Sequence, residues 1–106
     1  MSKILETKVK NLYDGKPIGF SKLKITIECP LDLGVSVTGE WIGVNGNVYL
    51  RMDDAWDFLM YVNEYRVNNP GHQFNRIAIF AEDSQVTDIH FSFDDFLQNQ
   101  TMENIL

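Results

Sequence analysis

The sequence predicts a small α+β domain, in which an antiparallel sheet of about five strands packs against one main helix at residues 54–67. Residues 22–29 alternate strictly between apolar and polar side chains, as a half-buried strand does. Two further pairs of strand-like segments are each joined by a short turn sequence. Helical apolar spacing is clearest over residues 54–67. With 106 residues and a mass of 12.2 kDa, residues 1–106 are expected to form a single domain.

The first thirteen residues fit two kinds of secondary structure. Leu5, Val9 and Leu12 would share one face of a helix, whereas Leu5, Thr7 and Val9 would share one face of a strand. The pattern favours a short helix that ends before Gly15. Both alternatives remain open from the sequence alone.

The first hairpin is predicted around Asn45-Gly46, a pair that supplies the two positive φ angles of a type I′ turn. This turn would place Val44 opposite Asn47, Ile42 opposite Tyr49, and Glu40 opposite Arg51 as an ion pair. The core face would then contain Val35, Val37, Trp41, Val48, Leu50 and Met52. The opposite face would contain Ser36, Thr38, Glu40, Ile42, Val44, Tyr49 and Arg51, and its apolar members indicate that something covers them.

The main helix is expected to begin at an N-cap in the Asp53-Asp54 pair and to end at the stop signals of residues 68–71. Trp56 and Met60 widen its apolar arc beyond what packing on one sheet requires. The predicted core stripe consists of Ala55, Phe58, Leu59, Val62, and Tyr65 or Arg66.

The C-terminal part predicts a second hairpin. Residues 74–81 are apolar on both sides, which favours a central strand buried on both faces. Residues 82–85 form a turn, and residues 86–93 return as a strand. Its inward side chains are Ile89, Phe91 and Phe93, and its outward ones are Asp88, His90 and Ser92. Residues 94–97 read as a capped turn or short helix before a polar tail.

Charge is distributed unevenly along the chain. Residues 1–24 contain six lysines and two acids, a balance of +4, whereas the remaining residues contain thirteen acids and three arginines, a balance of −10. No apolar stretch approaches a membrane span, and no signal peptide follows the start, so a cytoplasmic protein is expected. The lone Cys29 ends an apolar strand and is expected to be a buried structural thiol.

Residues suited to catalysis are scarce. His72 lies in a Pro-Gly loop and His90 on the outward side of a strand, and neither has a metal-ligand partner at helical spacing. No glycine-rich phosphate loop is present, and the calcium-loop pattern from Asp53 fails at Ala55 and Phe58. The ten net negative charges after residue 24 disfavour direct nucleic-acid binding. The sequence therefore predicts no catalytic residue, no metal and no cofactor, and a protein that is not an enzyme.

The acids after Ile25 concentrate in the main helix and its start, in the second hairpin, and at Asp94-Asp95. Such acids either serve solubility or face a basic partner, whose encounter they would accelerate. A protein that acts on RNA or DNA would itself be basic and would match this surface.

Residues 53–96 resemble small bacterial immunity proteins of toxin systems, in particular the antitoxin family typified by YezG. The matching segments are Asp54-Ala55-Trp56-Asp57-Phe58-Leu59, Asn75-Arg76-Ile77-Ala78-Ile79-Phe80 and His90-Phe91-Ser92-Phe93-Asp94-Asp95-Phe96. The resemblance implies an inhibitor that binds a cognate toxin domain in the cytoplasm, such as the nuclease of a contact-dependent growth inhibition system. It would block the active site or substrate surface of that toxin.

The partner-binding residues are expected on the helix, with a second group near the C-terminus, and the lysine-rich start is expected to lie outside the contact. Trp56 and Tyr61 fit a binding hot spot and partial core burial equally well. The protein would be a monomer or a weak dimer. Two alternatives are a small acidic secretion chaperone and a nucleic-acid mimic that inhibits a defence enzyme. The candidate residues are Asp53, Trp56, Asp57, Tyr61 and Glu64 on the helix, and Asp88, Asp94 and Asp95 in the second group.

Overall fold

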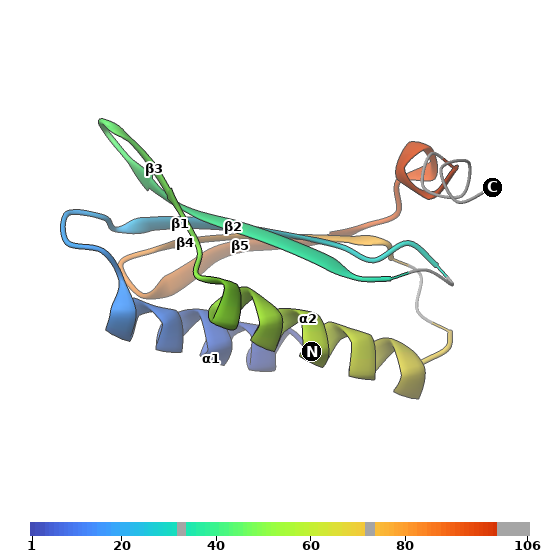
Figure 1. The fold of residues 1–106 in the computed structure, drawn as a ribbon. Coiled ribbons are helices and arrows are strands. Elements are labelled where there is room, and N and C mark those ends of the chain that lie inside the picture. Colours follow the sequence, from blue (N-terminus) through green and yellow to red (C-terminus); the bar gives the residue numbers. More distant parts are fainter. Residues whose placement is uncertain (32–33, 72–73, 100–106) are drawn as a thin grey trace.

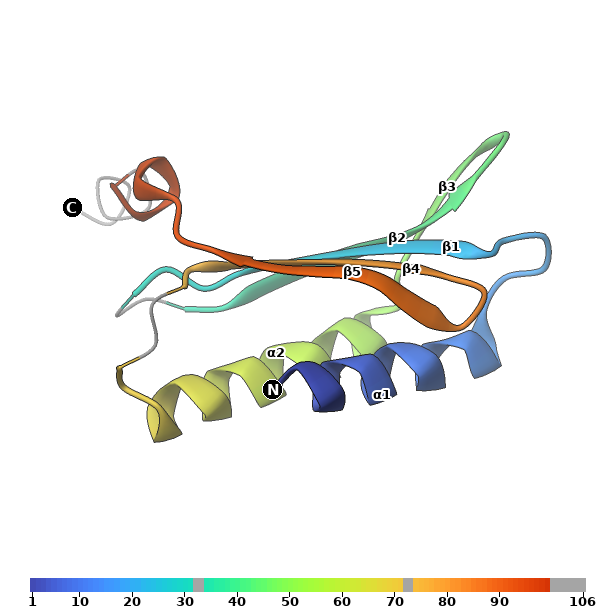
Figure 2. The ribbon, with the colours of Figure 1, turned by 180° about the vertical axis from the view of Figure 1, so that it is seen from behind.

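A computed structural model describes residues 1–31, 34–71 and 74–99. Five antiparallel strands form one sheet in the order β3-β2-β1-β4-β5, and two helices lie against one of its faces (Figures 1 and 2). This architecture confirms the predicted α+β class. The elements are α1 (Ser2–Leu12), a 3₁₀ turn η1 (Tyr13–Gly15), β1 (Lys22–Glu28), β2 (Ser36–Gly43), β3 (Gly46–Tyr49), α2 (Met52–Asn68), β4 (Arg76–Glu82) and β5 (Gln85–Ser92).

β1 lies at the centre of the sheet and shows why the core forms on one side. Leu23, Ile25 and Ile27 are buried against the helices, while Lys22 and Lys24 are exposed on the opposite face. Because successive side chains of a strand point to opposite faces, the alternation seen in the sequence gives one apolar and one polar side. The polar side, the open face of the sheet, is not covered by either α1 or α2 (Figure 1).

The N-terminal segment is a helix, as the pattern favoured. Leu5 and Val9, one turn apart, are fully buried, whereas Thr7 is exposed and its hydroxyl donates to the Lys3 carbonyl. A strand would have placed all three on one face. Beyond the helix, the Tyr13 ring meets Trp41 edge-on, with 5.0 Å between centroids.

The first hairpin turns one residue earlier than predicted. Gly43 pairs with Gly46 across a two-residue turn formed by Val44 and Asn45, neither of which has a positive φ; the positive φ, +136°, is that of Gly46, the next residue. The predicted type I′ turn at Asn45-Gly46 is therefore wrong. A Cβ on Gly43 would lie 2.5 Å from Phe20 Cε1 and 2.7 Å from the Gly46 carbonyl oxygen. Gly43 thus allows a close approach that a larger residue would prevent, whereas Gly46 suits its position because of its positive φ.

The earlier turn changes the partners of β2 but not its faces. Ile42 lies opposite Asn47 and Glu40 opposite Tyr49, because the pairing has slipped by two residues and the side-chain period of a strand is two. The predicted Glu40–Arg51 pair does not form, since Arg51 lies outside the ladder as the N-cap of α2.

The predicted core face of this hairpin is correct in its centre and wrong at its end. Trp41 and Leu50 are buried, and Val35 and Val37 are half-buried. Val48 is 43% exposed and Met52 is 87% exposed. The chain leaves the sheet after Tyr49, so Met52 begins α2 and turns away from the core.

α2 spans Met52–Asn68, two residues longer at its start than predicted. Arg51 is the N-cap and makes no side-chain capping bond, so the prediction of a cap in the Asp53-Asp54 pair is wrong. Both acids lie instead in the first turn, where their negative charges interact favourably with the positive end of the helix dipole. The predicted core stripe is confirmed: Phe58 and Val62 are fully buried, and Ala55, Leu59, Tyr65 and Arg66 are half-buried.

β4 and β5 form the second hairpin, as expected. Its turn contains Asp83 and Ser84, both with positive φ (51° and 71°), as a type I′ turn requires. β4 lies inside the sheet, between β1 and β5. Its predicted burial on both faces is wrong, because Ala78 and Phe80 are only half-buried on the open face.

The end of β5 leads into a helical turn at residues 95–99, which confirms the predicted capped segment. Phe93, expected inside, is 43% exposed because the chain has already left the sheet after Ser92. The predicted loop position of His72 lies outside the described residues, as does the polar tail after Asn99.

Candidate functional site

Four of the five candidate residues of α2 are exposed, and the fifth, Tyr61, packs partly against the core. Asp53, Asp57, Tyr61 and Glu64 follow one another at intervals of four, four and three residues, which places them along one line of the helix. Asp53, Asp57 and Glu64 are exposed, and Tyr61 is half-buried. The sequence prediction therefore selected residues that share one face.

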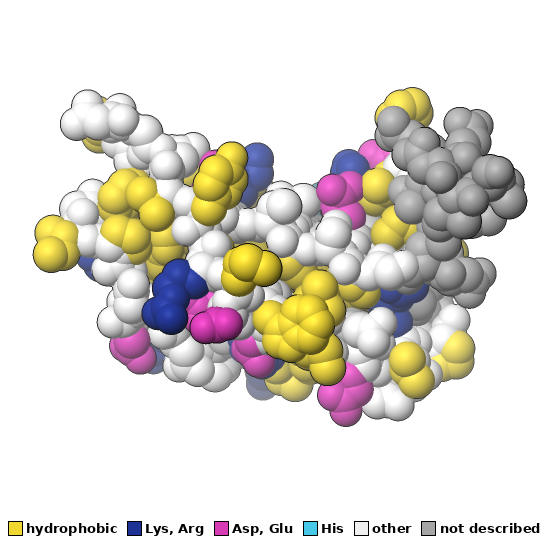
Figure 3. All heavy atoms as spheres, viewed as in Figure 1, with side chains coloured by type: hydrophobic (Ala, Val, Ile, Leu, Met, Phe, Trp, Pro, Cys, Tyr) yellow, Lys and Arg dark blue, Asp and Glu magenta, His cyan; other side chains and the backbone are white. Residues whose placement is uncertain are grey.

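An exposed apolar stripe runs beside this line of acids. Met52, Trp56 and Met60 lie one turn apart and are 87%, 61% and 49% exposed. We call Met52, Asp53, Trp56, Met60 and Glu64 the α2 surface. Figure 3 shows hydrophobic side chains gathered on this side of the molecule, over the front of α2 and the base of the β2–β3 hairpin.

One acid of the helix is already paired within the molecule. Lys8 of α1 places its ammonium group 2.7 Å from Asp57 Oδ2 and 5.5 Å from the centroid of the Tyr61 ring. Burial, followed by the neighbouring Tyr65 and Glu64, raises the pKa of the Tyr61 hydroxyl. The lysine-rich start therefore reaches the edge of the acidic line instead of lying apart from it.

The second candidate group does not join the first. Asp88 pairs with Phe80 on the open face of the sheet, on the side opposite α2. Asp94 and Asp95 lie beyond the end of β5, at the start of the helical turn. Since the sheet separates Asp88 from α2, a single flat partner surface cannot contact both Asp88 and the acids of α2.

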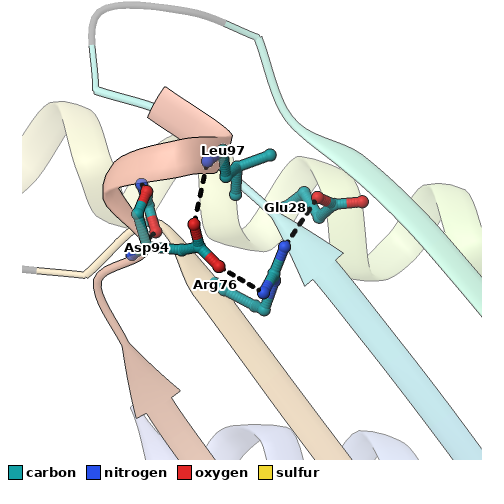
Figure 4. A network of polar contacts seen from close by, with 5 residues as sticks. Glu28, Arg76, Asp94 and Leu97 are labelled. Atoms are coloured by element: carbon teal, nitrogen blue, oxygen red, sulfur yellow. Dashed lines mark hydrogen bonds and ion pairs between the residues drawn. The ribbon is translucent and has the colours of Figure 1, made fainter. Parts of the chain in front are cut away.

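Asp94 has a structural role (Figure 4). Its Oδ1 accepts a hydrogen bond from the Leu97 backbone N–H at 2.8 Å, and its Oδ2 accepts one from Arg76 Nη1 at 2.9 Å. Arg76 also pairs with Glu28 of β1 at 3.4 Å. The Leu97 N–H, together with Arg76, holds the pKa of the Asp94 carboxyl below its usual value. Asp94 therefore caps the helical turn at residues 95–99 and, through Arg76, ties it to β4 and β1.

A small hollow of about 230 Å³ lies on the open face, between β1, β2 and the end of β3. Lys24 and Glu40 are neighbours across the strands at this hollow, and the Lys24 ammonium lies 5.9 Å from the centroid of the Phe80 ring. The polar side-chain groups that line the hollow are one carboxylate, one ammonium group and several hydroxyls. The lining residues are Lys24, Thr26, Thr38, Gly39, Glu40 and Tyr49.

Sequence reasoning missed part of the exposed apolar surface. It assigned Met52 to the core face of the hairpin, and it noted Met60 without including it in the site. The excess apolar arc around Trp56 was the available signal, since a helix with one packed face needs no apolar residue there. Periodicity placed Val44 and Tyr49 on the face opposite the core, and both are exposed (103% and 80%), so the expectation that something covers them is wrong for the described residues.

Within residues 1–31, 34–71 and 74–99, no three His, Cys, Asp or Glu side chains are grouped so that they could hold a metal ion. None of the helices in these ranges is long and apolar enough to cross a membrane. Cys29 is fully buried, and burial raises the pKa of its thiol to about 11, which confirms the expected structural cysteine. No protein-family model matches the chain, and comparison with curated proteins finds no similar sequence.

Proposed function

We propose that the protein is an immunity protein that binds and neutralises a cognate toxin domain, a basic nuclease, through the α2 surface. It acts in the cytoplasm by covering the active site or the substrate surface of the toxin, without chemistry of its own. The observation that carries this proposal is the exposed stripe of Met52, Trp56 and Met60 beside the acids of α2.

The apolar stripe supports a binding role because it has no use within the described fold. Trp56 is 61% exposed, although a tryptophan gains more from burial than almost any other residue. Exposed aromatic and Met side chains rimmed by charges are typical of protein interfaces, and Trp is the residue most enriched at their energetic centres. The stripe would lie at the centre of the interface, with the acids around it.

The acids favour a basic partner over a second copy of the chain. Two copies that paired along α2 would bring the Asp53 and Glu64 carboxylates of both molecules to the same seam, where their repulsion would oppose association. A basic partner would meet the same carboxylates with attraction. A nuclease domain is such a partner, because its own substrate is an anion.

Ion pairs within the molecule change what Asp57 and Asp53 can contribute to binding. The Asp57 carboxylate already has a cation at 2.7 Å, so a partner cation would have to share or displace Lys8. Asp53 lies 3.9 Å from Arg51, and both of these side chains are highly exposed, which makes their pairing weak. We therefore expect Asp53 and Glu64 to contribute more to partner binding than Asp57.

The experiment uses the C-terminal domain encoded by the gene directly upstream, purified and titrated with this protein by calorimetry. Reversal of three acids (Asp53→Lys, Asp57→Lys, Glu64→Lys) should weaken binding at least 100-fold, and Trp56→Ala at least 10-fold. Asp88→Lys, the reversal of a single acid on the open face, is the control for charge reversal elsewhere and should leave the affinity unchanged. Circular dichroism verifies that each variant is folded.

Two results would overturn the proposal. One is that the domain encoded by the upstream gene does not bind the protein and does not harm cells that lack the protein. The other is that the triple reversal leaves the affinity unchanged, which would remove the α2 surface from the interface.

A further inference from the structure

The β2–β3 hairpin ends in an uncharged tip that projects from the sheet (Figure 1). Residues 42–49, which we call the finger, contain no charged side chain, although 23% of the chain is charged. Residues 17–21, which lie beside it, are uncharged as well. All four residues of β3 are exposed, and Val44 at the tip is 103% exposed. The tip therefore contributes little to the core.

The finger is nevertheless held in place. The Phe20 ring packs against Gly43, and the Asn47 side-chain oxygen accepts a hydrogen bond from the Gly43 N–H at 3.3 Å. Residues 17–21 and the finger enclose a groove of about 450 Å³, lined by Ile18, Phe20, Val44 and Val48 among others. An exposed hairpin that is braced in one shape loses less conformational freedom on binding than a mobile loop does.

The finger is continuous with the α2 surface. Val48 of β3, on the same face of the sheet as the buried Trp41 opposite it, is 43% exposed, and Met52 starts α2 four residues later with 87% exposed. In Figure 3 the hydrophobic side chains of the hairpin and those at the front of α2 appear on the same side of the molecule. A partner seated on α2 would therefore reach the finger without passing over the sheet.

We propose that the finger inserts into an uncharged, apolar cleft of the same toxin domain that the α2 surface contacts, with Val44 at the deepest point. This inference rests on the proposed function and adds to it a division of the interface into two parts. Basic residues of the partner face α2, and apolar residues of its cleft enclose the finger. If acidic or basic residues lined the cleft, residues 42–49 would bury those charges without a counter-charge, and this would oppose binding.

A protein cleft fits the finger better than a membrane surface does. The turn that contains Asp83 lies at the same end, since the Asp83 N–H donates at 3.0 Å to the carbonyl of Ser21, the last residue of the segment 17–21. Glu82 pairs with Lys22, which in turn lies opposite Ile42 of the finger. Residues 42–49 contain no Lys or Arg, and Lys22 beside them is balanced by Glu82, so the finger lacks the cluster of basic residues that attracts anionic lipid headgroups.

The test replaces Val44 by Asn, which removes the aliphatic side chain without adding charge and suits a turn position. Ile4→Asn on α1, where Ile4 is 48% exposed, is the control for loss of an exposed aliphatic group elsewhere. Binding of the upstream-encoded domain should weaken at least 10-fold for Val44→Asn and less than 2-fold for Ile4→Asn. Melting temperatures of both variants should stay close to that of the wild type. Amide exchange of residues 42–49 should slow in the wild-type complex.

Each other outcome overturns the inference. If the triple α2 reversal abolishes binding while Val44→Asn binds like the wild type, the finger lies outside the interface and the proposed function still stands. If no variant or wild-type protein binds the domain, the proposed function fails first. Sedimentation of the protein with phosphatidylglycerol vesicles, lost in Val44→Asn, would assign the finger to a membrane. A dimer lost in Val44→Asn would assign it to a second copy.

Discussion

Cys29 is the residue whose chemistry the fold suppresses most clearly. Its side chain is fully buried next to the end of β1, and burial raises its thiol pKa to about 11, an effect that nearby Arg66 only partly offsets. At about pH 8 the reactive thiolate would be on the order of one part in a thousand of the total. We expect native protein to resist a disulfide reagent that labels the unfolded chain at once, as measured by release of the chromophoric thiol. Rapid labelling of folded protein would show that this edge of the core opens.

Asp94 predicts how acid weakens the fold. Its pKa is lowered in the folded state by the Leu97 N–H and by Arg76, so its stabilising effect is present above the unfolded value near 3.8 and is lost as pH falls through the lower folded value. Asp94→Asn should therefore melt at a lower temperature than the wild type at neutral pH. It should also lose less stability between about pH 5 and pH 2. Asp95→Asn, a change at the exposed neighbour, should follow the wild-type curve, and equal curves for all three proteins would contradict the role of Asp94.

Among the secondary-structure elements, the hairpins show what a sequence specifies and what it leaves to tertiary packing. Strand faces were predictable, because a two-residue slip preserves the alternation that buries Trp41 and Leu50. The turn itself was not, because Phe20, more than twenty residues away in sequence, packs on Gly43 and favours a turn at Val44-Asn45. The two positive φ angles occur instead at Asp83 and Ser84, residues that tolerate the left-handed region less well than Gly.

Gly39 offers a direct test of the packing between β2 and the chain that enters α2. A Cβ at this position would lie 2.9 Å from Leu50 Cδ2, 3.1 Å from Leu50 Cβ and 3.4 Å from Ile25 Cγ1. The Leu50 N–H also donates to the Gly39 carbonyl at 2.7 Å, so Leu50 cannot easily move away. Gly39→Ala should lower the free energy of unfolding by about 1–3 kcal/mol in urea denaturation.

The matched control for Gly39 is Gly15→Ala at the end of η1. No atom lies within 4 Å of the Cβ that this change would add, and the φ of Gly15 is not positive. This variant should be as stable as the wild type or more stable by up to about 1 kcal/mol, because alanine restricts the unfolded chain. Equal losses for both variants would indicate that a general glycine effect, and not crowding at Leu50, sets the stability.

At the scale of the whole molecule, folding rearranges the charge asymmetry of the sequence. The helix acids were predictable as candidates because they share one face, but the contact between Lys8 and Asp57 joins residues 49 positions apart and required the tertiary structure. The separation of Asp88 from α2 also required the tertiary structure, because it arises from the sheet that lies between them. The basic start and the acidic remainder thus meet along the α1–α2 side, and the acids that stay unpaired there are fewer than the sequence indicates.

This arrangement predicts how salt affects the proposed complex. Asp53 and Glu64 are exposed at the rim of the α2 surface, where screened charges mainly change the association rate, whereas Trp56 and Val44 would be enclosed and mainly change the dissociation rate. Surface plasmon resonance should show association with the upstream-encoded domain slowing about 10-fold between low and high ionic strength, with little change in dissociation. Trp56→Ala should speed dissociation and leave the association rate nearly unchanged. Lys8→Met, which exposes the Asp57 charge, should speed association at low salt. An association rate that salt and Lys8→Met both leave unchanged would mean that the acids of α2 do not steer the partner.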